Sequence, residues 1–72
     1  MRKETRGMKQ LKTIINQELK ENEHIFILRR EEVAMSRGIM HEHTIEDLWD
    51  FYSPKDKVTS FWHEDGLCII LK

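Results

Sequence analysis

The chain has 72 residues, and its 12 Lys and Arg against 13 Asp and Glu give a formal net charge of −1. Such a balance supplies no general attraction to nucleic acid, so a nucleic-acid surface would need locally clustered basic residues. The single cysteine, Cys68, excludes an intramolecular disulfide, and with the lack of an 18-residue apolar run it favours a cytoplasmic protein without membrane association.

A chain of this length is expected to form one domain, which buries only about 60% of the surface that its unfolded state exposes. Residues 1–7 contain Arg2, Lys3 and Arg6 without apolar periodicity, and they predict a flexible basic tail. Residues 8–72 are then predicted to form the single folded domain.

An amphipathic helix is predicted to begin at Met8, because apolar residues recur there at helical spacing. The apolar stripe consists of Met8, Leu11, Ile15 and Leu19. Asn22 is expected to terminate this first helix.

Two short elements are predicted next. Residues His24–Leu28 form a brief run rich in β-branched and aromatic residues, which indicates a strand. Residues Arg30–Arg37 predict a short helix, with Val33 and Ala34 facing inward and Gly38 following its end.

A second amphipathic helix is predicted over Thr44–Tyr52. Thr44 can cap its first turn, where the negative charges of Glu46 and Asp47 suit the helix dipole. Its apolar stripe consists of Ile45, Leu48, Trp49 and Tyr52, and it stops before Ser53-Pro54.

A β-hairpin is predicted over Val58–Leu71, because two apolar-rich runs flank Asp65-Gly66, a pair suited to a two-residue turn. This turn would pair Trp62 with Ile69, His63 with Cys68 and Phe61 with Ile70. Both faces of the hairpin would be partly apolar, so we expect a homodimer through the outer face that carries Phe61 and Ile70.

The predicted order of helix, strand, helix, helix and hairpin resembles a winged helix-turn-helix domain over residues 8–71. The helix-turn-helix pattern is carried by Val33-Ala34, Gly38-Ile39 and Thr44-Ile45 with Leu48, although the gap after Gly38 is one residue longer than usual. The resemblance implies a winged-helix-like α+β fold, with Thr44–Tyr52 as the recognition helix and the hairpin as the wing.

Carboxylates occupy both elements that would face DNA in such a domain, and they repel its phosphates. We therefore expect a small regulatory binding protein, an inhibitor or adaptor, that binds a protein partner. The predicted partner surface comprises Glu46, Asp47, Asp50, Phe51, Glu64 and Asp65.

The alternative function is a dimeric DNA-binding transcription regulator that uses basic residues elsewhere on the surface. The candidate nucleic-acid contacts are Arg29, Arg30, Arg37, Lys55 and Lys57.

Catalysis and cofactor binding are not expected. His41 and His43, with Glu46, Asp50 and His63, suggest a metal site, but their spacing lacks the second Cys/His pair that a tetrahedral site requires. The predicted pairing of Cys68 with His63 suggests an activated thiol, yet a cysteine between Leu67 and Ile69 is more typical of a buried apolar residue.

Overall fold

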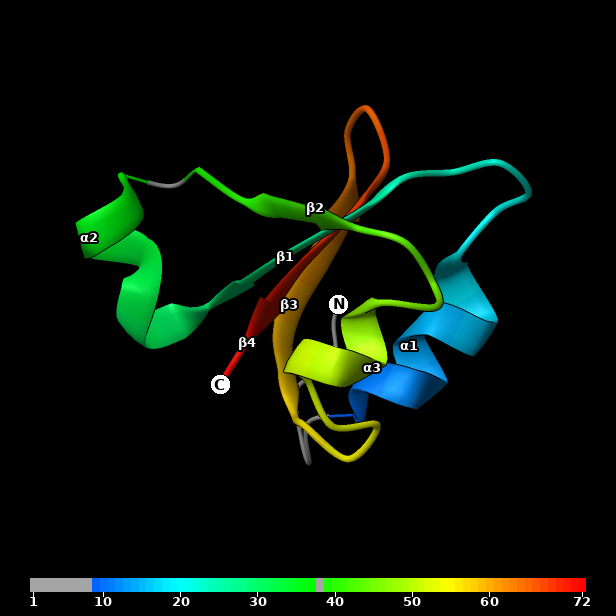
Figure 1. Cartoon of the computed structure of the whole chain (residues 1–72), viewed down its shortest axis with the longest axis horizontal. Helices are drawn as coiled ribbons and strands as arrows, with labels where there is room; N and C mark the ends of the chain where they lie inside the picture. The colour runs from blue at the N-terminus through cyan, green and yellow to red at the C-terminus, as the bar shows by residue number, and fades with distance from the viewer. Residues whose placement is uncertain (1–8, 38) are drawn as a thin grey trace, which may run out of the picture.

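A computed structural model describes residues 9–37 and 39–72 and confirms the α+β class (Figure 1). The elements in chain order are α1 (Leu11–Glu18), β1 (Ile25–Arg29), the 3-10 turn η1 (Arg30–Glu32), α2 (Val33–Ser36), β2 (His41–His43), α3 (Leu48–Phe51), β3 (Val58–His63) and β4 (Leu67–Leu71). The predicted basic tail and Gly38 lie outside the described residues. Within the described ranges, no helix has the length and apolarity needed to cross a bilayer.

The strands form one mixed sheet in the order β2-β1-β4-β3. β1 runs parallel to β4 through five residue pairs, from Ile25 with Leu67 to Arg29 with Leu71. β2 and β3 flank this pair as antiparallel edge strands. The first and last predicted strands of the chain are thus neighbours in the centre of the sheet.

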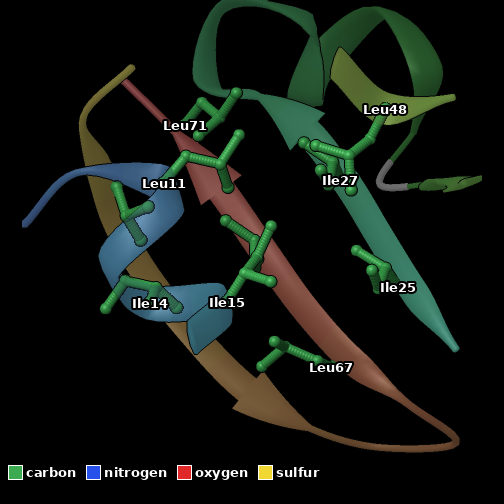
Figure 2. Packing of buried hydrophobic residues seen from close by; sticks show 10 residues of the cluster. Leu11, Ile14, Ile15, Ile25, Ile27, Leu48, Leu67 and Leu71 are labelled. Atoms are coloured by element: carbon green, nitrogen blue, oxygen red, sulfur yellow. The ribbon is translucent and has the colours of Figure 1, made fainter. Parts of the chain in front are cut away.

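The core lies between one face of this sheet and the helices α1 and α3, and Figure 2 shows its side chains between the strands and α1. Its buried members are Leu11, Ile14, Ile15, Ile25, Ile27, Leu48, Val58, Leu67, Ile69 and Leu71. The predicted stripe of the first helix is confirmed, since Leu11 and Ile15 are buried and Leu19 packs against the core. Met8 is outside the described residues.

The first helix begins later than predicted, at Leu11. Gln10 is extended and bridges to Lys57, while the Val58 amide donates to the Lys9 carbonyl. The backbone before the helix therefore pairs with the segment that leads into β3. The helix also ends before Asn22, which instead adopts a left-handed turn conformation with φ 65°.

The predicted helix over Arg30–Arg37 is present as η1 followed by α2, but Val33, which was expected to face inward, does not. The side chain of Ala34, the other residue of that predicted face, lies outside what the structure describes. Val33 is 38% exposed and Met35 is 85% exposed. The segment projects beyond the end of the sheet in Figure 1, which leaves little for these side chains to pack against. The residue with a left-handed conformation at its end is Arg37, with φ 56°.

The helix predicted over Thr44–Tyr52 is also shorter, because only Leu48–Phe51 is helical. Thr44 nevertheless caps the preceding turn: its Oγ1 accepts from the Asp47 amide, and Asp47 Oδ1 accepts from the Thr44 amide, both at 3.1 Å. Leu48 is buried as predicted, whereas Ile45 is 44% exposed.

The strand β2 was not predicted. Its three residues, His41–His43, are polar and gave no strand signal, but they pair with Ile25–Ile27 of β1. Tertiary pairing thus sets the conformation of a segment whose own sequence favours a loop.

The predicted hairpin is present, but its register was wrong by one residue. Phe61 pairs with Ile69, Trp62 with Cys68 and His63 with Leu67, so the loop has three residues rather than two. Asp65 and Gly66 both have positive φ, at 60° and 145°. A shift of one residue moves every side chain of β3 to the other face of the sheet.

The corrected register separates two pairs of residues that we expected together. Phe61 shares the helix-covered face with Ile69, whereas Ile70 pairs with Ser60 on the outer face. The dimer surface predicted through Phe61 and Ile70 is therefore not one face. His63 and Cys68 likewise face opposite sides of the sheet, so the imidazole cannot activate the thiol.

Gly66 has no room for a side chain. A Cβ there would lie 2.7 Å from the His24 carbonyl oxygen and 2.8 Å from Phe26 Cε2, and its φ of 145° disfavours L residues. We expect Gly66→Ala to lower the free energy of unfolding by about 2 kcal/mol, measured by urea denaturation. Asp65→Asn is the matched control in the same turn, since Asn tolerates its left-handed conformation. Equal stability of the two variants would contradict the close approach.

Candidate protein-binding site

Residues that pair across the strands form rows, and the rows at the two ends of the sheet lie beside differently charged segments. His43, Ile25, Leu67 and His63 form one terminal row, and the chain beside this row carries carboxylates. We call these residues the acidic end: Glu23, Glu46, Asp47, Glu64 and Asp65. The opposite row is Arg29, Leu71 and Val58. The basic residues that flank it, which we call the basic end, are Arg29, Arg30, Lys55, Lys57 and Lys72, and Glu31, Glu32 and Asp56 lie among them in the chain.

An open hollow with a volume of about 590 Å³ lies between β2 and α3. Its lining residues are Met40, His41, Glu42, His43, Asp47, Phe51 and Tyr52. Among the residues that the structure describes, the lining combines the carboxylate of Asp47 with aromatic rings and imidazoles, and it includes no lysine or arginine. The capped turn that begins at Thr44 brings Asp47 and Phe51, four residues apart, to the same side of the chain.

The side chain of His43 in this lining is nine-tenths buried, with 10% of its surface exposed. Its ring centroid lies 5.2 Å from that of Phe51 and 5.2 Å from that of Tyr52, which it meets nearly at right angles. Its Nδ1 lies 3.4 Å from Asp47 Oδ1. Its Nε2 is buried without a hydrogen-bond partner within the described ranges. A buried ring nitrogen without a partner is uncommon in folded proteins and calls for an explanation.

The six predicted partner-binding residues are only partly brought together. Asp47 and Phe51 line the hollow, and Phe51 is 64% exposed. Glu46 and Asp50 are exposed on the same segment but do not line it. Glu64 and Asp65 are exposed at the hairpin tip, where β1 separates them from β2. Sequence analysis did not assign His43 to this surface, because β2 gave no strand signal, and it placed Tyr52 in the apolar stripe of the predicted helix.

The predicted nucleic-acid contacts also lie in separate parts of the structure. Arg29 lies 5.3 Å from the centre of the Tyr52 ring, and its Nη2 donates to Asp56 Oδ2 at 3.2 Å. Burial first, and then the charge of Glu32, raises the pKa of Tyr52, so this ring stays neutral. Lys55 and Lys57 flank Asp56, so the contact from Arg29 brings them near β1. Arg37 follows α2 on the projecting segment.

Catalytic chemistry finds no support in the surroundings of Cys68. Its thiol is buried, and its Sγ lies 3.5 Å from the Glu64 carbonyl oxygen. Burial raises the pKa of this thiol, which disfavours the reactive thiolate. In the part of the chain that the structure describes, no three His, Cys, Asp or Glu side chains are arranged to hold a metal ion.

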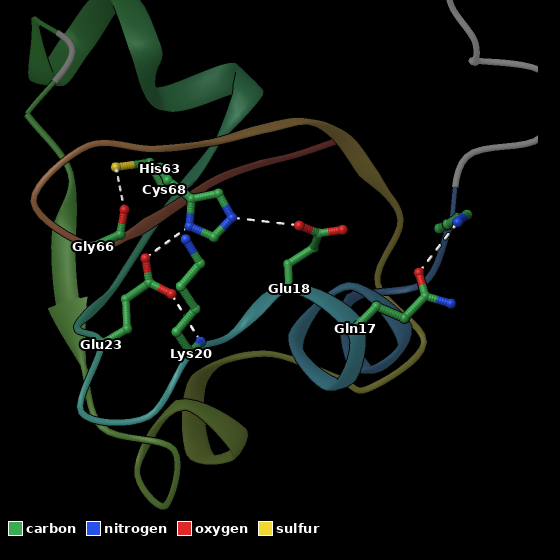
Figure 3. A network of polar contacts seen from close by, with 8 residues as sticks. Gln17, Glu18, Lys20, Glu23, His63, Gly66 and Cys68 are labelled. Carbon is green, nitrogen blue, oxygen red and sulfur yellow. Dashed lines mark hydrogen bonds and ion pairs between the residues drawn. The ribbon is translucent and has the colours of Figure 1, made fainter.

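Two histidines at the acidic end are held by carboxylates. The ring of His24 pairs with Glu42 across β1 and β2. His63 contacts Glu23 through Nδ1 at 2.7 Å and Glu18 through Nε2 at 3.4 Å, as Figure 3 shows. The His63 contacts connect β3 to α1 and to the loop that precedes β1.

Comparison of the chain with protein-family models, curated proteins and solved structures gave no match.

The His63 network predicts a pH-dependent stability. Hydrogen bonds to Glu23 and then Glu18 raise the pKa of His63, because only the imidazolium donates from both ring nitrogens. This stabilisation is complete below the unfolded value of about 6.5 and is lost as pH rises through the folded pKa. The bond from His63 lowers the pKa of Glu23, so that contribution is lost as pH falls through its folded pKa, below 4.5.

We therefore expect His63→Gln to destabilise the protein more at pH 5.5 than at pH 8.5, as measured by urea midpoints, since these values lie roughly below and above the histidine range. His41→Gln is the control, because it removes an exposed imidazole from β2. A loss for His63→Gln that is the same at both pH values would show that the charged network contributes nothing.

Proposed function

We propose that the chain is a small cytoplasmic regulatory binding protein, an inhibitor or adaptor, that contacts a protein partner through Glu46, Asp47, Asp50, Phe51, Glu64 and Asp65. The single observation that carries this proposal is the 64% exposure of Phe51 beside the open hollow. Aromatic residues at the edge of a pocket are frequent energetic centres of protein interfaces. The surrounding carboxylates supply charge selectivity and favour a basic partner surface.

The winged-helix resemblance is part of the proposal. In that resemblance α3 corresponds to the recognition helix, and the β3–β4 hairpin corresponds to the wing. Asp50 lies in α3, and Glu64 and Asp65 lie at the hairpin tip. These charges would repel the phosphates of DNA, so the same elements are better suited to a protein partner.

The partner can be isolated with the tagged chain from lysate of the cells that produce it, with and without nuclease, and its affinity then measured by calorimetry. We expect Phe51→Ala to weaken binding at least about tenfold, because truncation of an interface anchor commonly costs more than 1.4 kcal/mol. Asp50→Lys should also weaken binding, because it reverses a charge beside Phe51 without altering the hollow.

Glu31→Lys is the matched control for Asp50→Lys, since it makes the same charge change on η1, outside the proposed surface. The exposure of Phe51 predicts that Phe51→Ala keeps the stability of the parent chain within about 0.5 kcal/mol. Unchanged affinity for both Phe51→Ala and Asp50→Lys would refute the proposed surface.

A DNA-binding regulator acting as a dimer is the second candidate function, and the basic end supports it. The sheet register gathers Arg29, Lys57 and Lys72 at one edge of the molecule, although Asp56 neutralises Arg29. If this function holds, affinity for duplex DNA falls steeply with rising salt, and Lys57→Glu with Lys72→Glu reduces that slope by about 1 to 2. Recovery of the partner only without nuclease would place this function first.

A further inference from the structure

We propose that the open edge of β2 receives an extended segment of the protein partner, which joins the sheet as a further strand. This inference rests on the proposed function and deepens it, because it names the form in which the partner presents its residues. Three features carry it: the backbone of Glu42 at the strand edge, the hollow that borders this edge, and the exposed ring of Phe51.

The register of the sheet determines which backbone groups lie at the open edge of β2, which is the outermost strand beside β1 (Figure 1). The carbonyl of His24 points toward β4, where it accepts from the Leu67 amide. Successive residues of a strand direct their backbone groups to opposite sides, so Ile25 directs its own toward His43 of β2, its paired residue. By the same alternation along β2, Glu42 directs its N–H and C=O away from β1.

The outward N–H and C=O of Glu42 are available to a ligand. Within residues 9–37 and 39–72, no group forms a hydrogen bond to this edge of β2. The next residue, Thr44, is already bonded, since its amide donates to Asp47 Oδ1 and its carbonyl accepts from the Leu48 amide. An extended peptide supplies the matching acceptor and donor, whereas a helix uses its backbone groups internally.

The hollow between β2 and α3 borders this edge. Four consecutive residues, Met40–His43, belong to its lining. Side chains of successive strand residues alternate between the two faces of the sheet, so such a run lines one hollow where the hollow also borders the backbone. Phe51 lies on the other side of the hollow with 64% of its surface exposed. A strand bound at the edge therefore directs alternate side chains toward Phe51.

The residues at the edge select the side chains of the bound segment. Glu42 pairs with Phe26, whose neighbours Ile25 and Ile27 belong to the core, so its carboxylate lies on the face away from α1 and α3. It contacts His24 there and stays 53% exposed. Opposite charges stabilise a cross-strand pair, which favours lysine or arginine opposite Glu42. The residues on either side of that position face the hollow, where an aromatic wall favours apolar side chains.

A second copy of the chain is a poorer occupant of the same edge. Two β2 edges that pair about a two-fold axis through Glu42 place its carboxylate opposite that of the second copy. Like charges in that position destabilise paired strands. We therefore assign the edge to a different chain with the pattern apolar, basic, apolar.

The test is a titration of the intact, 15N-labelled chain with the capped pentapeptide acetyl-Thr-Val-Lys-Val-Thr-amide, whose β-branched residues favour an extended backbone. We expect a saturable shift of the Glu42 backbone amide resonance with a dissociation constant on the order of 1 mM, since the ligand is one short strand. The backbone amide of Phe61, in the other edge strand, should not shift.

Two altered peptides test the backbone and the charge separately. Methylation of the lysine backbone nitrogen removes the donor for the Glu42 carbonyl and keeps every side chain, so we expect binding at least about fivefold weaker. Replacement of lysine by glutamate keeps the backbone and should weaken binding at least about threefold.

Variants of the chain test the same contacts from the other side. Glu42→Lys should reverse the charge preference, so that the glutamate peptide binds more tightly than the lysine peptide. Glu31→Lys makes the same charge change on η1, away from β2, and should keep the original preference. Phe51→Ala should weaken binding of the lysine peptide about threefold or more, because it removes the apolar wall of the hollow.

Three results would overturn strand addition: no saturable shift of the Glu42 amide, equal binding of the methylated and unmethylated peptides, or a shift that depends on the concentration of the chain alone, which assigns the edge to a second copy. None of them involves the partner, so they are distinct from failure of the proposed function. If partner affinity depends on Phe51 and Asp50 while the pentapeptide does not bind, the proposed interface stands and strand addition falls. If the pentapeptide binds as expected and partner affinity ignores both residues, strand addition stands and the proposed interface falls.

Discussion

The parallel pairing of β1 with β4 is the constraint on which the rest of the structure depends. Parallel strands cannot be joined by a tight turn, so everything from η1 to β3 belongs to the connection between them. Leu67, Ile69 and Leu71 are fully buried in this central strand, which is why the helices must cover its inner face. The Leu67 amide donates to the His24 carbonyl where the pairing begins, and the backbone there passes too close for any residue except Gly66.

The two charged ends of the molecule follow from that pairing. Because β1 and β4 are parallel, both strands begin at the same edge of the sheet and both end at the opposite edge. Acidic residues precede β1 and β4, whereas Arg30 and Lys72 follow them. One end of the sheet therefore lies beside carboxylates, and the other lies beside residues of both charges, because Glu31 and Glu32 follow Arg30 and Asp56 pairs with Arg29. The net charge does not reveal this arrangement, because it does not depend on where the residues lie in the structure.

The local sequence predicted the elements that depend on their own residue pattern. It did not predict the elements that depend on pairing with a distant strand. The apolar stripe of α1 and the strand β1 were predicted correctly, whereas Thr44 closes the turn before α3 and Asp47 is the N-cap residue of that helix. No local sequence pattern indicates that β4 is the parallel partner of β1. The segment β2 is a strand because it pairs with the edge of β1. The hairpin register was missed because Asp65-Gly66 suits a two-residue turn, while the three-residue loop places the Trp62 indole within 3.3 Å of Glu64. Half of the candidate site, Asp47 with Phe51, was predictable from spacing; His43 was not.

His43 illustrates why the missed residue is the most informative one. A phenylalanine or leucine at this position could pack against Phe51 and Tyr52 without burying an unpaired nitrogen. Among residues 9–37 and 39–72 the buried imidazole nitrogen has no hydrogen-bond partner, which costs roughly 1–3 kcal/mol in a chain whose total stability is on the order of 5 kcal/mol. Packing alone gives no reason to keep such a group. The contact of its Nδ1 with Asp47 Oδ1, at 3.4 Å, joins β2 to the turn that precedes α3, and neither phenylalanine nor leucine could make that contact.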